Sequence, residues 1–358
     1  METEKFVREL QSSDRGRSKY AIYFRIDYPK TRTVVDDVHD DVHDDDDEDE
    51  IKGVFVFSHG LHEHSDSFED FFKVLCANFK IACVSFDHRG HGLSESYKGA
   101  HRHQIESFEE SVRDMREACE IAKERFGLGI PISIGGVSMG GLFALHCALT
   151  YPKEYFAAIV LIAPAINVQW TMEKRFLAKL GGFLAKCLPN AKIVPATNPE
   201  FLSDDFETIE NFKNDPMNYI GKARAKFGNE ILKAMKSLAL DDYAKLNGIA
   251  KNVLAIHAEK DKATDCKATE QLFTNHLKDI ENKKFVKFTH TNGHLLLFEP
   301  GKDFTRDLIG RFLVDSMNTY TINEKRKDRG STSSYSMRSS NSSRENKSGE
   351  ETVLKSKL

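Results

Sequence analysis

The chain lacks the features that mark several classes of protein. Its six cysteines are scattered along 358 residues without a Cys-x-x-Cys pair, which predicts buried thiols rather than a disulfide framework or a zinc site. No apolar run approaches the ~20 residues of a membrane-spanning helix, and the polar N-terminus has no signal-peptide pattern. The formal net charge of -4 argues against a general nucleic-acid-binding protein.

A glycine-flanked serine stands near the middle of the chain, in the stretch from Gly136 to Gly141. An apolar run, 131–134, precedes it, and a run with helical spacing, 142–149, follows. This Gly-x-Ser-x-Gly between strand and helix is the pattern of the nucleophile elbow of an α/β-hydrolase. The turn would lift the Ser138 hydroxyl above the sheet and place the Met139 amide at a helix N-terminus, where an oxyanion is stabilised. Alone, the motif leaves open a glycine-rich turn that merely contains a serine.

Apolar strand-like runs alternate with amphipathic helical runs through most of the chain. This alternation predicts an α/β fold with a mostly parallel central sheet and helices on both faces. The segment 166–246 breaks the alternation, because it contains helical runs and prolines but no convincing strand. We expect it to form a helical cap inserted between core residues 20–165 and 247–320. The strands are expected at 20–28, 54–57, 81–86, 131–134, 157–163, 253–257 and 285–288, and the helices at 68–79, 107–126, 142–149, 267–277 and 300–317.

Three polar segments are expected to carry little fixed structure. Residues 1–19 predict a flexible N-terminal arm, and the dense carboxylates of 36–50 predict a disordered acidic loop inside the first part of the core. Beyond residue 320 the composition shifts to serine, lysine, arginine, asparagine and glycine, which predicts a disordered tail over 321–358. The tail ends Ser356-Lys357-Leu358, the address that a peroxisomal import receptor reads. The expected location is therefore the peroxisome, with the cytoplasm as the alternative.

A serine nucleophile needs a base and an acid from later strands, in the chain order serine, acid, histidine. Asp261 follows the strand at 253–257, and His294 follows the strand at 285–288 through a glycine that can turn it back over the elbow. We therefore predict Asp261 as the acid and His294 as the base. The competitors are Asp265, which reads better as a helix N-cap, and His290, which stands too close to the strand end.

The loop after the first buried strand is expected to supply a second oxyanion donor. His59-Gly60 predicts a close-packed turn that turns the Leu61 amide toward the substrate oxygen. The side chain of His59 is expected to brace this loop by hydrogen bonds. Asp87, Arg89 and His91 are likewise expected to lock the next loop rather than to take part in chemistry.

Taken together, these motifs resemble the monoacylglycerol lipase family of serine α/β-hydrolases over roughly residues 51–317. The resemblance implies a triad of Ser138, Asp261 and His294, with the amides of Leu61 and Met139 as the oxyanion hole. The acidic insertion and the long tail depart from the family pattern without touching these motifs. The resemblance is carried by His59–Ser65, Phe86–Ser94, Gly136–Gly141, Asp261–Asp265 and His294–Glu299, and in the cap by 188–190 and 215–217.

The expected activity is cleavage of the ester bond of monoacylglycerol-like lipids through an acyl-enzyme, without a metal or organic cofactor. A lysophospholipase or an acyl-CoA thioesterase with the same triad is the close alternative. A catalytically inactive hydrolase used as a binding module is a remote one, because no triad residue or elbow glycine is missing. An apolar stripe at helical spacing in the cap predicts an acyl-chain channel and transient contact with a lipid surface, unless it only packs the cap on the core. The stripe consists of Met172, Phe176, Leu180, Phe183, Leu184 and Cys187.

Overall fold

The computed structural model describes residues 1–11, 19–30, 50–96, 102–289, 291 and 293–339. The chain divides into two compact units, residues 1–318 and 319–358. Three predictions concern parts outside the described residues: the acidic loop apart from Glu50, the competitor His290, and the C-terminal tripeptide 356–358. They stay predictions. Among the described residues, no helix has both the length and the apolar character needed to cross a membrane.

The first unit is built on an eight-stranded sheet with the order β1-β2-β4-β3-β5-β6-β9-β10. Six strands of this sheet run parallel to one another: β3, β4, β5, β6, β9 and β10. Strands β1 and β2 are antiparallel additions at one edge. The middle strands are buried along their whole length, as their continuous apolar runs require in a sheet covered on both faces. The strands are β1 (Glu2–Gln11), β2 (Lys19–Tyr28), β3 (Gly53–Ser58), β4 (Ile81–Phe86), β5 (Ile132–Val137), β6 (Ile159–Ile162), β9 (Asn252–Ala258) and β10 (Asn282–Phe288).

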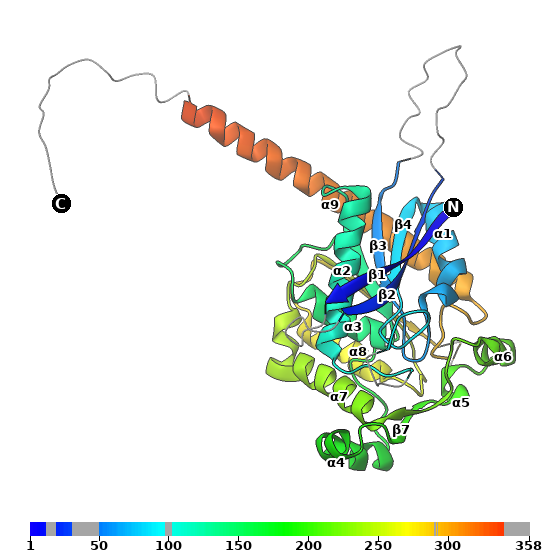
Figure 1. The fold of residues 1–358 in the computed structure, drawn as a ribbon. Helices are drawn as coiled ribbons and strands as arrows, with labels where there is room; N and C mark the ends of the chain where they lie inside the picture. Colours follow the sequence, from blue (N-terminus) through cyan, green and yellow to red (C-terminus); the bar gives the residue numbers. More distant parts are fainter. Residues whose placement is uncertain (12–18, 31–49, 97–101, 290, 292, 340–358) are drawn as a thin grey trace, which may run out of the picture. The chain divides into compact units, whose positions relative to one another are not determined.

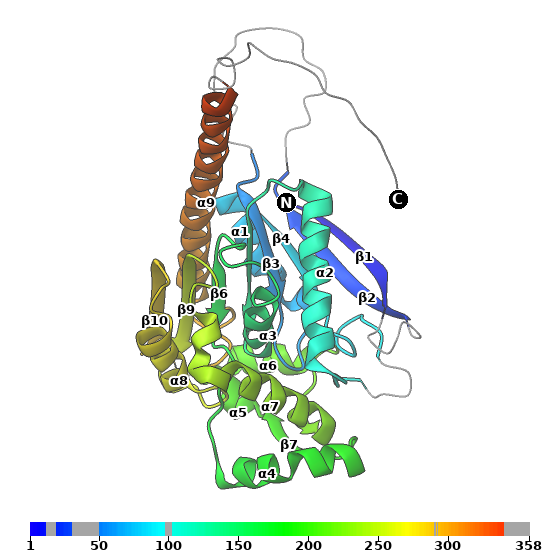
Figure 2. The ribbon, with the colours of Figure 1, turned by 90° about the vertical axis from the view of Figure 1, so that its left-hand side faces the viewer.

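Helices cover the sheet, so the predicted α/β-hydrolase architecture is confirmed. Figure 2 shows α2 and α3 in front of β3 and β4. On another part of the sheet, α1 packs closely against α9. The contact leaves no room for a side chain at Gly310 of α9, where a Cβ would clash with the ring of Phe79 at the end of α1. The covering helices are α1 (Glu69–Phe79), α2 (Phe108–Phe126), α3 (Met139–Ala148), α8 (Cys266–Gln271) and α9 (Lys302–Ser339), with single turns η1 (Ser65–Phe68) and η3 (Leu272–His276).

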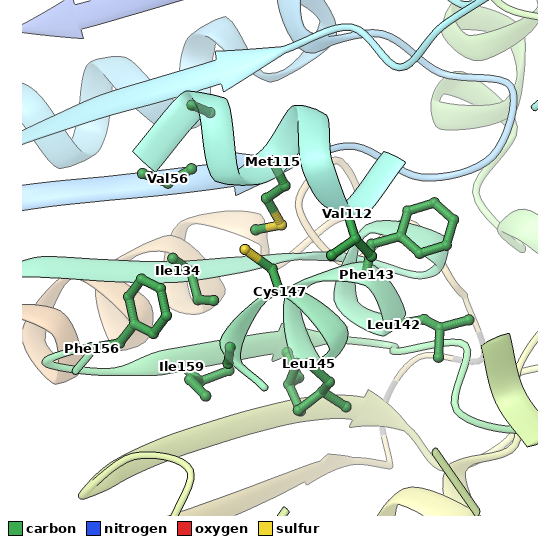
Figure 3. Close-up of a cluster of buried hydrophobic side chains, with 14 of the residues drawn as sticks. Val56, Val112, Met115, Ile134, Leu142, Phe143, Leu145, Cys147, Phe156 and Ile159 are labelled. Carbon is green, nitrogen blue, oxygen red and sulfur yellow. The ribbon is translucent and has the colours of Figure 1, made fainter. Parts of the chain in front are cut away.

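The main core lies between α2, α3 and the sheet (Figure 3). Met115 of α2 and Phe143 of α3 are fully buried, as is Ile134 of β5. Complete burial of side chains of this size stabilises the fold by roughly 1.5–3 kcal/mol each. This packing fixes α3 against β5, and with it the turn that joins them.

The N-terminal segment is a strand, so the predicted flexible arm over 1–19 is wrong for residues 2–11. β1 pairs with β2 from Glu2 opposite Tyr28 to Gln11 opposite Lys19. Only alternate side chains of β1 approach the core, and Phe6 stacks on Phe24 with ring centroids 5.8 Å apart. An edge strand that buries so few apolar residues has a weak sequence signal.

The tail prediction is wrong for residues 321–339, which continue α9 to Ser339. Extending an existing helix adds one hydrogen bond per residue without a new nucleation step. No proline follows Pro300 to stop the helix. A polar composition therefore did not exclude helix here.

The segment between β6 and β9 forms the cap, and it contains two strands that the sequence analysis missed. β7 (Lys192–Thr197) and β8 (Gly221–Arg224) make an antiparallel ribbon with irregular register. Pro195 interrupts the apolar alternation of β7, and β8 has only four residues, so neither gives a period-two pattern. The other cap elements are α4 (Met172–Cys187), α5 (Pro199–Leu202), α6 (Phe206–Asn214), α7 (Ala225–Ala239) and η2 (Leu240–Leu246), drawn in green and yellow-green in Figure 1.

Candidate active site

Ser138 lies in the sharp turn between β5 and α3. Its backbone has φ 53° and ψ -115°, a left-handed conformation that non-glycine residues rarely adopt. Surrounding hydrogen bonds hold it there: its amide donates to the Ile162 carbonyl, and its carbonyl accepts from the Ala165 amide, both at 2.9 Å. The strained turn presents the side chain at the carboxyl end of the sheet, where α/β proteins place their ligands.

The two glycines that flank the serine allow β3, β5 and α3 to approach one another. A Cβ at either Gly136 or Gly140 would clash with the carbonyl oxygen of Ser58, the last residue of β3. Ser58 pairs directly with Gly136 across the sheet. The loop that follows β3, with Leu61, is thereby held beside the serine turn.

His294 and Asp261, predicted as base and acid, are in direct contact. Nδ1 of His294 lies 2.7 Å from Oδ2 of Asp261, and both side chains are buried. Burial is the largest single effect and opposes ionisation of each group, but their mutual attraction and their other partners together outweigh it. The pKa of His294 therefore lies above its ordinary value, and the pKa of Asp261 lies below its own. Asp261 is therefore charged, and the His294 ring presents Nε2 as its free basic nitrogen.

The Asp261 carboxylate has a fixed orientation. Oδ1 accepts hydrogen bonds from the amides of Ala263 and Thr264 at 2.7 and 3.0 Å. Oδ2 faces His294, and it also accepts from the Thr264 hydroxyl at 2.9 Å, with Nε2 of His257 at 3.2 Å. Asp265, the competing acid, instead caps α8 as predicted, accepting from the amides of Lys267 and Ala268.

The two predicted oxyanion donors and the two reactive side chains line one cavity of 190 Å³. Met139 is the first residue of α3, where amides have no acceptor within the helix. Leu61 follows the turn after β3. The cavity thus gathers Leu61, the neighbours Ser138 and Met139, and His294 from three distant parts of the chain.

His59 braces the turn that carries Leu61. Its Nε2 accepts from the His88 amide at 3.0 Å, so its Nδ1 carries the proton and donates to the Gly60 carbonyl at 2.7 Å. Burial lowers the pKa of His59 well below its ordinary value, so the ring is neutral. This bracing role is the one expected from the sequence.

The neighbouring loop after β4 is locked in the way the sequence predicted. Asp87 accepts from the amides of Ser65 and Leu93, each at 2.7 Å. Arg89 is fully buried and bonds to Asp114 at 2.7 Å. None of these groups lines the cavity that contains Ser138.

The sequence reasoning assigned no role to Glu63, although it stands inside the His59–Ser65 motif. Its buried carboxylate lines the cavity and accepts from the Gly60 amide at 2.8 Å. Burial raises the pKa of Glu63 to about 7. A carboxyl group with this pKa is partly protonated near neutral pH, so beside Ser138 it can either donate or accept a hydrogen bond.

The cavity wall in the cap is mostly apolar, but of the predicted stripe of α4 it uses Leu184 alone. Met172, Phe176 and Phe183 are exposed by 83%, 64% and 66%, so the prediction that they line a channel is wrong. A neighbouring face of α4 lines the cavity instead. α4 has apolar residues on two faces, and the face with small side chains leaves room for the cavity. The lining residues of α4 are Lys174, Leu177, Ala178, Gly181 and Leu184.

Comparisons with known proteins agree with this architecture. The family described as "Serine aminopeptidase, S33" matches residues 49–301. Among solved structures, a monoacylglycerol lipase from Paleococcus ferrophilus is 21% identical, with a TM-score of 0.63 over 74% of this chain and 95% of that one. A soluble variant of monoglyceride lipase from Saccharomyces cerevisiae is 16% identical, with a TM-score of 0.68 over 86% and 94% of the two chains. Phospholipase YtpA of Bacillus subtilis is 24% identical over 59% of this chain and 77% of its own length.

Proposed function

Because the chain belongs to the serine aminopeptidase S33 family of hydrolases, we propose that it is a serine esterase that cleaves monoacylglycerol-like lipids to fatty acid and glycerol. One observation carries the proposal: Ser138, His294 and the residues of both oxyanion amides line a single, mostly apolar cavity. The buried hydrogen bond from His294 to Asp261 supports the assignment of base and acid.

The chemistry follows from this arrangement. Nε2 of His294 takes the proton of the Ser138 hydroxyl as Oγ attacks the ester carbonyl. The amides of Leu61 and Met139 stabilise the tetrahedral oxyanion, and Asp261 stabilises the imidazolium. The intermediate then collapses to an acyl-enzyme while His294 protonates the departing glycerol oxygen. His294 next takes a proton from water, which attacks the acyl-enzyme. The second tetrahedral intermediate then collapses, His294 gives this proton to Oγ of Ser138 as the acyl–oxygen bond breaks, and the fatty acid is released.

The apolar wall supports an acyl chain as the bound group. Leu177 and Leu184 of α4 line the cavity together with Ile231 and Leu232 of α7, and such a wall offers few partners for the polar backbone of a peptide. The exposed Phe176 and Phe183 on the other side of α4 support transient contact of the cap with a lipid surface.

The second candidate is a phospholipid-type ester as substrate. The relative named Phospholipase YtpA favours it, and the same triad and cavity would serve. An acyl-CoA thioesterase would use the same catalytic groups, so the test compares substrates of all three kinds.

Labelling with a fluorophosphonate tests the proposed chemistry, with Ser138→Ala as the control. We expect the intact protein to be labelled and the variant to be unlabelled while its thermal unfolding stays the same. Activity is then measured on monoacylglycerol, lysophosphatidylcholine and acyl-CoA of one chain length. Labelling that persists in Ser138→Ala, or hydrolysis of none of the three, would refute the proposal.

A further inference from the structure

A second cavity, of 270 Å³, lies on the β7–β8 ribbon next to the loop that precedes α2. It has no role in the chemistry proposed above. We call it the cationic pocket, because four of the seven residues that line it are basic and none is acidic. They are Arg102, His103, Lys192, Tyr219, Lys222, Ala223 and Arg224.

Neutral groups, not carboxylates, hold the basic side chains of the cationic pocket. Arg102 donates to the carbonyls of Gly92 and Ser94, and Arg224 donates to the Asn190 carbonyl at 2.9 Å. Nζ of Lys192 lies 4.9 Å from the centre of the Tyr219 ring. Within the part of the chain that the structure describes, no ion pair neutralises these side chains. Their charge is therefore available to a ligand.

The aromatic groups of the pocket pack against one another. The ring of His103 stacks on Tyr219 with centroids 5.2 Å apart, and both rings contact the buried His62. Burial lowers the pKa of His103 to about 4, and the charges of Arg102, Lys192 and Arg224 add to this effect. The three cations are thus close enough to one another to create a shared positive potential.

The ribbon also separates this pocket from the cavity that contains Ser138. Lys192 of β7 lines the cationic pocket, while Ile193 beside it lines the Ser138 cavity. Arg224, the last residue of β8, lines the pocket, whereas Ala225, the first residue of α7, lines the cavity, and Ala223 borders both. The two spaces are therefore neighbours across one thin wall.

We propose that the cationic pocket binds a phosphoryl group, either as free phosphate or as the head group of a phospholipid-type substrate. Two guanidinium groups and two ammonium groups around a concave site suit a compact dianion, because arginine bonds phosphate oxygens in pairs and lysine adds point charge. That the phosphoryl group belongs to a lipid head group rests on the proposed esterase function, whereas the phosphoryl site itself does not depend on it.

The test uses the full chain carrying Ser138→Ala, so that binding is measured without turnover. Inorganic phosphate and glycerol 3-phosphate are titrated calorimetrically at low ionic strength, where charge interactions are least screened. The pocket variant is Lys192→Gln/Lys222→Gln. The matched control is Lys52→Gln/Lys186→Gln, which removes the same charge from exposed lysines outside the pocket.

We expect saturable binding of at least one of the two probes, weakened about tenfold or more by the pocket variant and unchanged by the control. Absence of saturable binding of both, or equal binding by pocket variant and control, would overturn the proposal.

Kinetics with Ser138 intact then distinguishes the two sources. If the ligand is the head group, the pocket variant raises KM for lysophosphatidate and leaves KM for monoacylglycerol unchanged. If it is free phosphate, both KM values stay unchanged while calorimetric binding is lost. A chain that binds phosphate but hydrolyses neither lipid would refute the esterase proposal and leave the phosphoryl site standing.

Discussion

The substitution Asp261→Asn tests the acid assignment most sharply, because the structure fixes how the new amide must lie. Oδ1 of Asp261 accepts from two backbone amides, those of Ala263 and Thr264. Only the oxygen of asparagine can take that place. The amide nitrogen must then occupy the position of Oδ2, which lies 2.7 Å from Nδ1 of His294.

Two losses follow from this geometry. The first is the charge-assisted hydrogen bond that stabilises the His294 imidazolium, worth about 2–3 kcal/mol, or roughly 30- to 150-fold in rate. The second is the tautomer: an N–H of the new amide faces Nδ1, so Nδ1 must accept and the ring proton moves to Nε2. A ring protonated there cannot take the proton of Ser138. Together we expect kcat to fall on the order of 10³- to 10⁴-fold.

The assay is steady-state hydrolysis of a soluble short-chain ester, with circular dichroism to show that the variant is folded. KM should change little, because the lost interactions act on the transition state. Asp265→Asn is the matched control, since Asp265 caps α8, and it should leave kcat within about threefold. If Asp265→Asn proved the more damaging change, or Asp261→Asn kept most of the activity, our assignment of the acid would be wrong.

Three further outcomes are expected. A protonated His294 cannot act as a base, so kcat/KM should fall as the pH drops through its pKa. Burial lowers that pKa, but the Asp261 carboxylate together with Glu63 and Glu299 raises it above the ordinary 6.5, so the pH at which kcat/KM is half its maximum should lie above 6.5 and should move down in Asp261→Asn. Phe176→Asp should slow hydrolysis of long-chain lipid in vesicles and spare a short soluble ester, because Phe176 is 64% exposed; equal losses on both would contradict a surface-contact role. Gly140→Ala should lower the melting temperature and abolish fluorophosphonate labelling, because its Cβ would clash with the end of β3; a labelled variant of normal stability would disprove the close approach.

The parts of the molecule that were predictable are those where local pattern and burial agree. The strands β3, β4, β5 and β9 are mainly apolar because both faces of the sheet are covered. The serine turn could be predicted from the sequence because only glycines fit where Gly136 and Gly140 meet β3. The order of the acid and base loops then brought Asp261 and His294 within reach of one another.

The remainder was hidden because its stabilisation comes from distant partners. β1 is mostly polar on its exposed side, and its half-buried side chains gain their contacts only when β2 is in place. β7 contains Pro195, and its strand character depends on pairing with β8. α4 has apolar residues on two faces, and only the packing of the cap decides which face borders the cavity. Glu63 likewise acquires its raised pKa from burial that no local pattern reports.

The outer strand β1 also decides what the molecule presents to other copies of itself. Arg8 forms ion pairs with Glu117 and Glu124 of α2, and Lys5 forms one with Asp66. These ion pairs hold β1 at the edge of the sheet. Behind it β2 is almost wholly buried. Removing residues 1–11 would leave the amides and carbonyls of β2 open along an apolar edge, the kind of surface on which chains add strand to strand. By covering this edge, residues 1–11 oppose self-association, and a chain without them should be prone to aggregate.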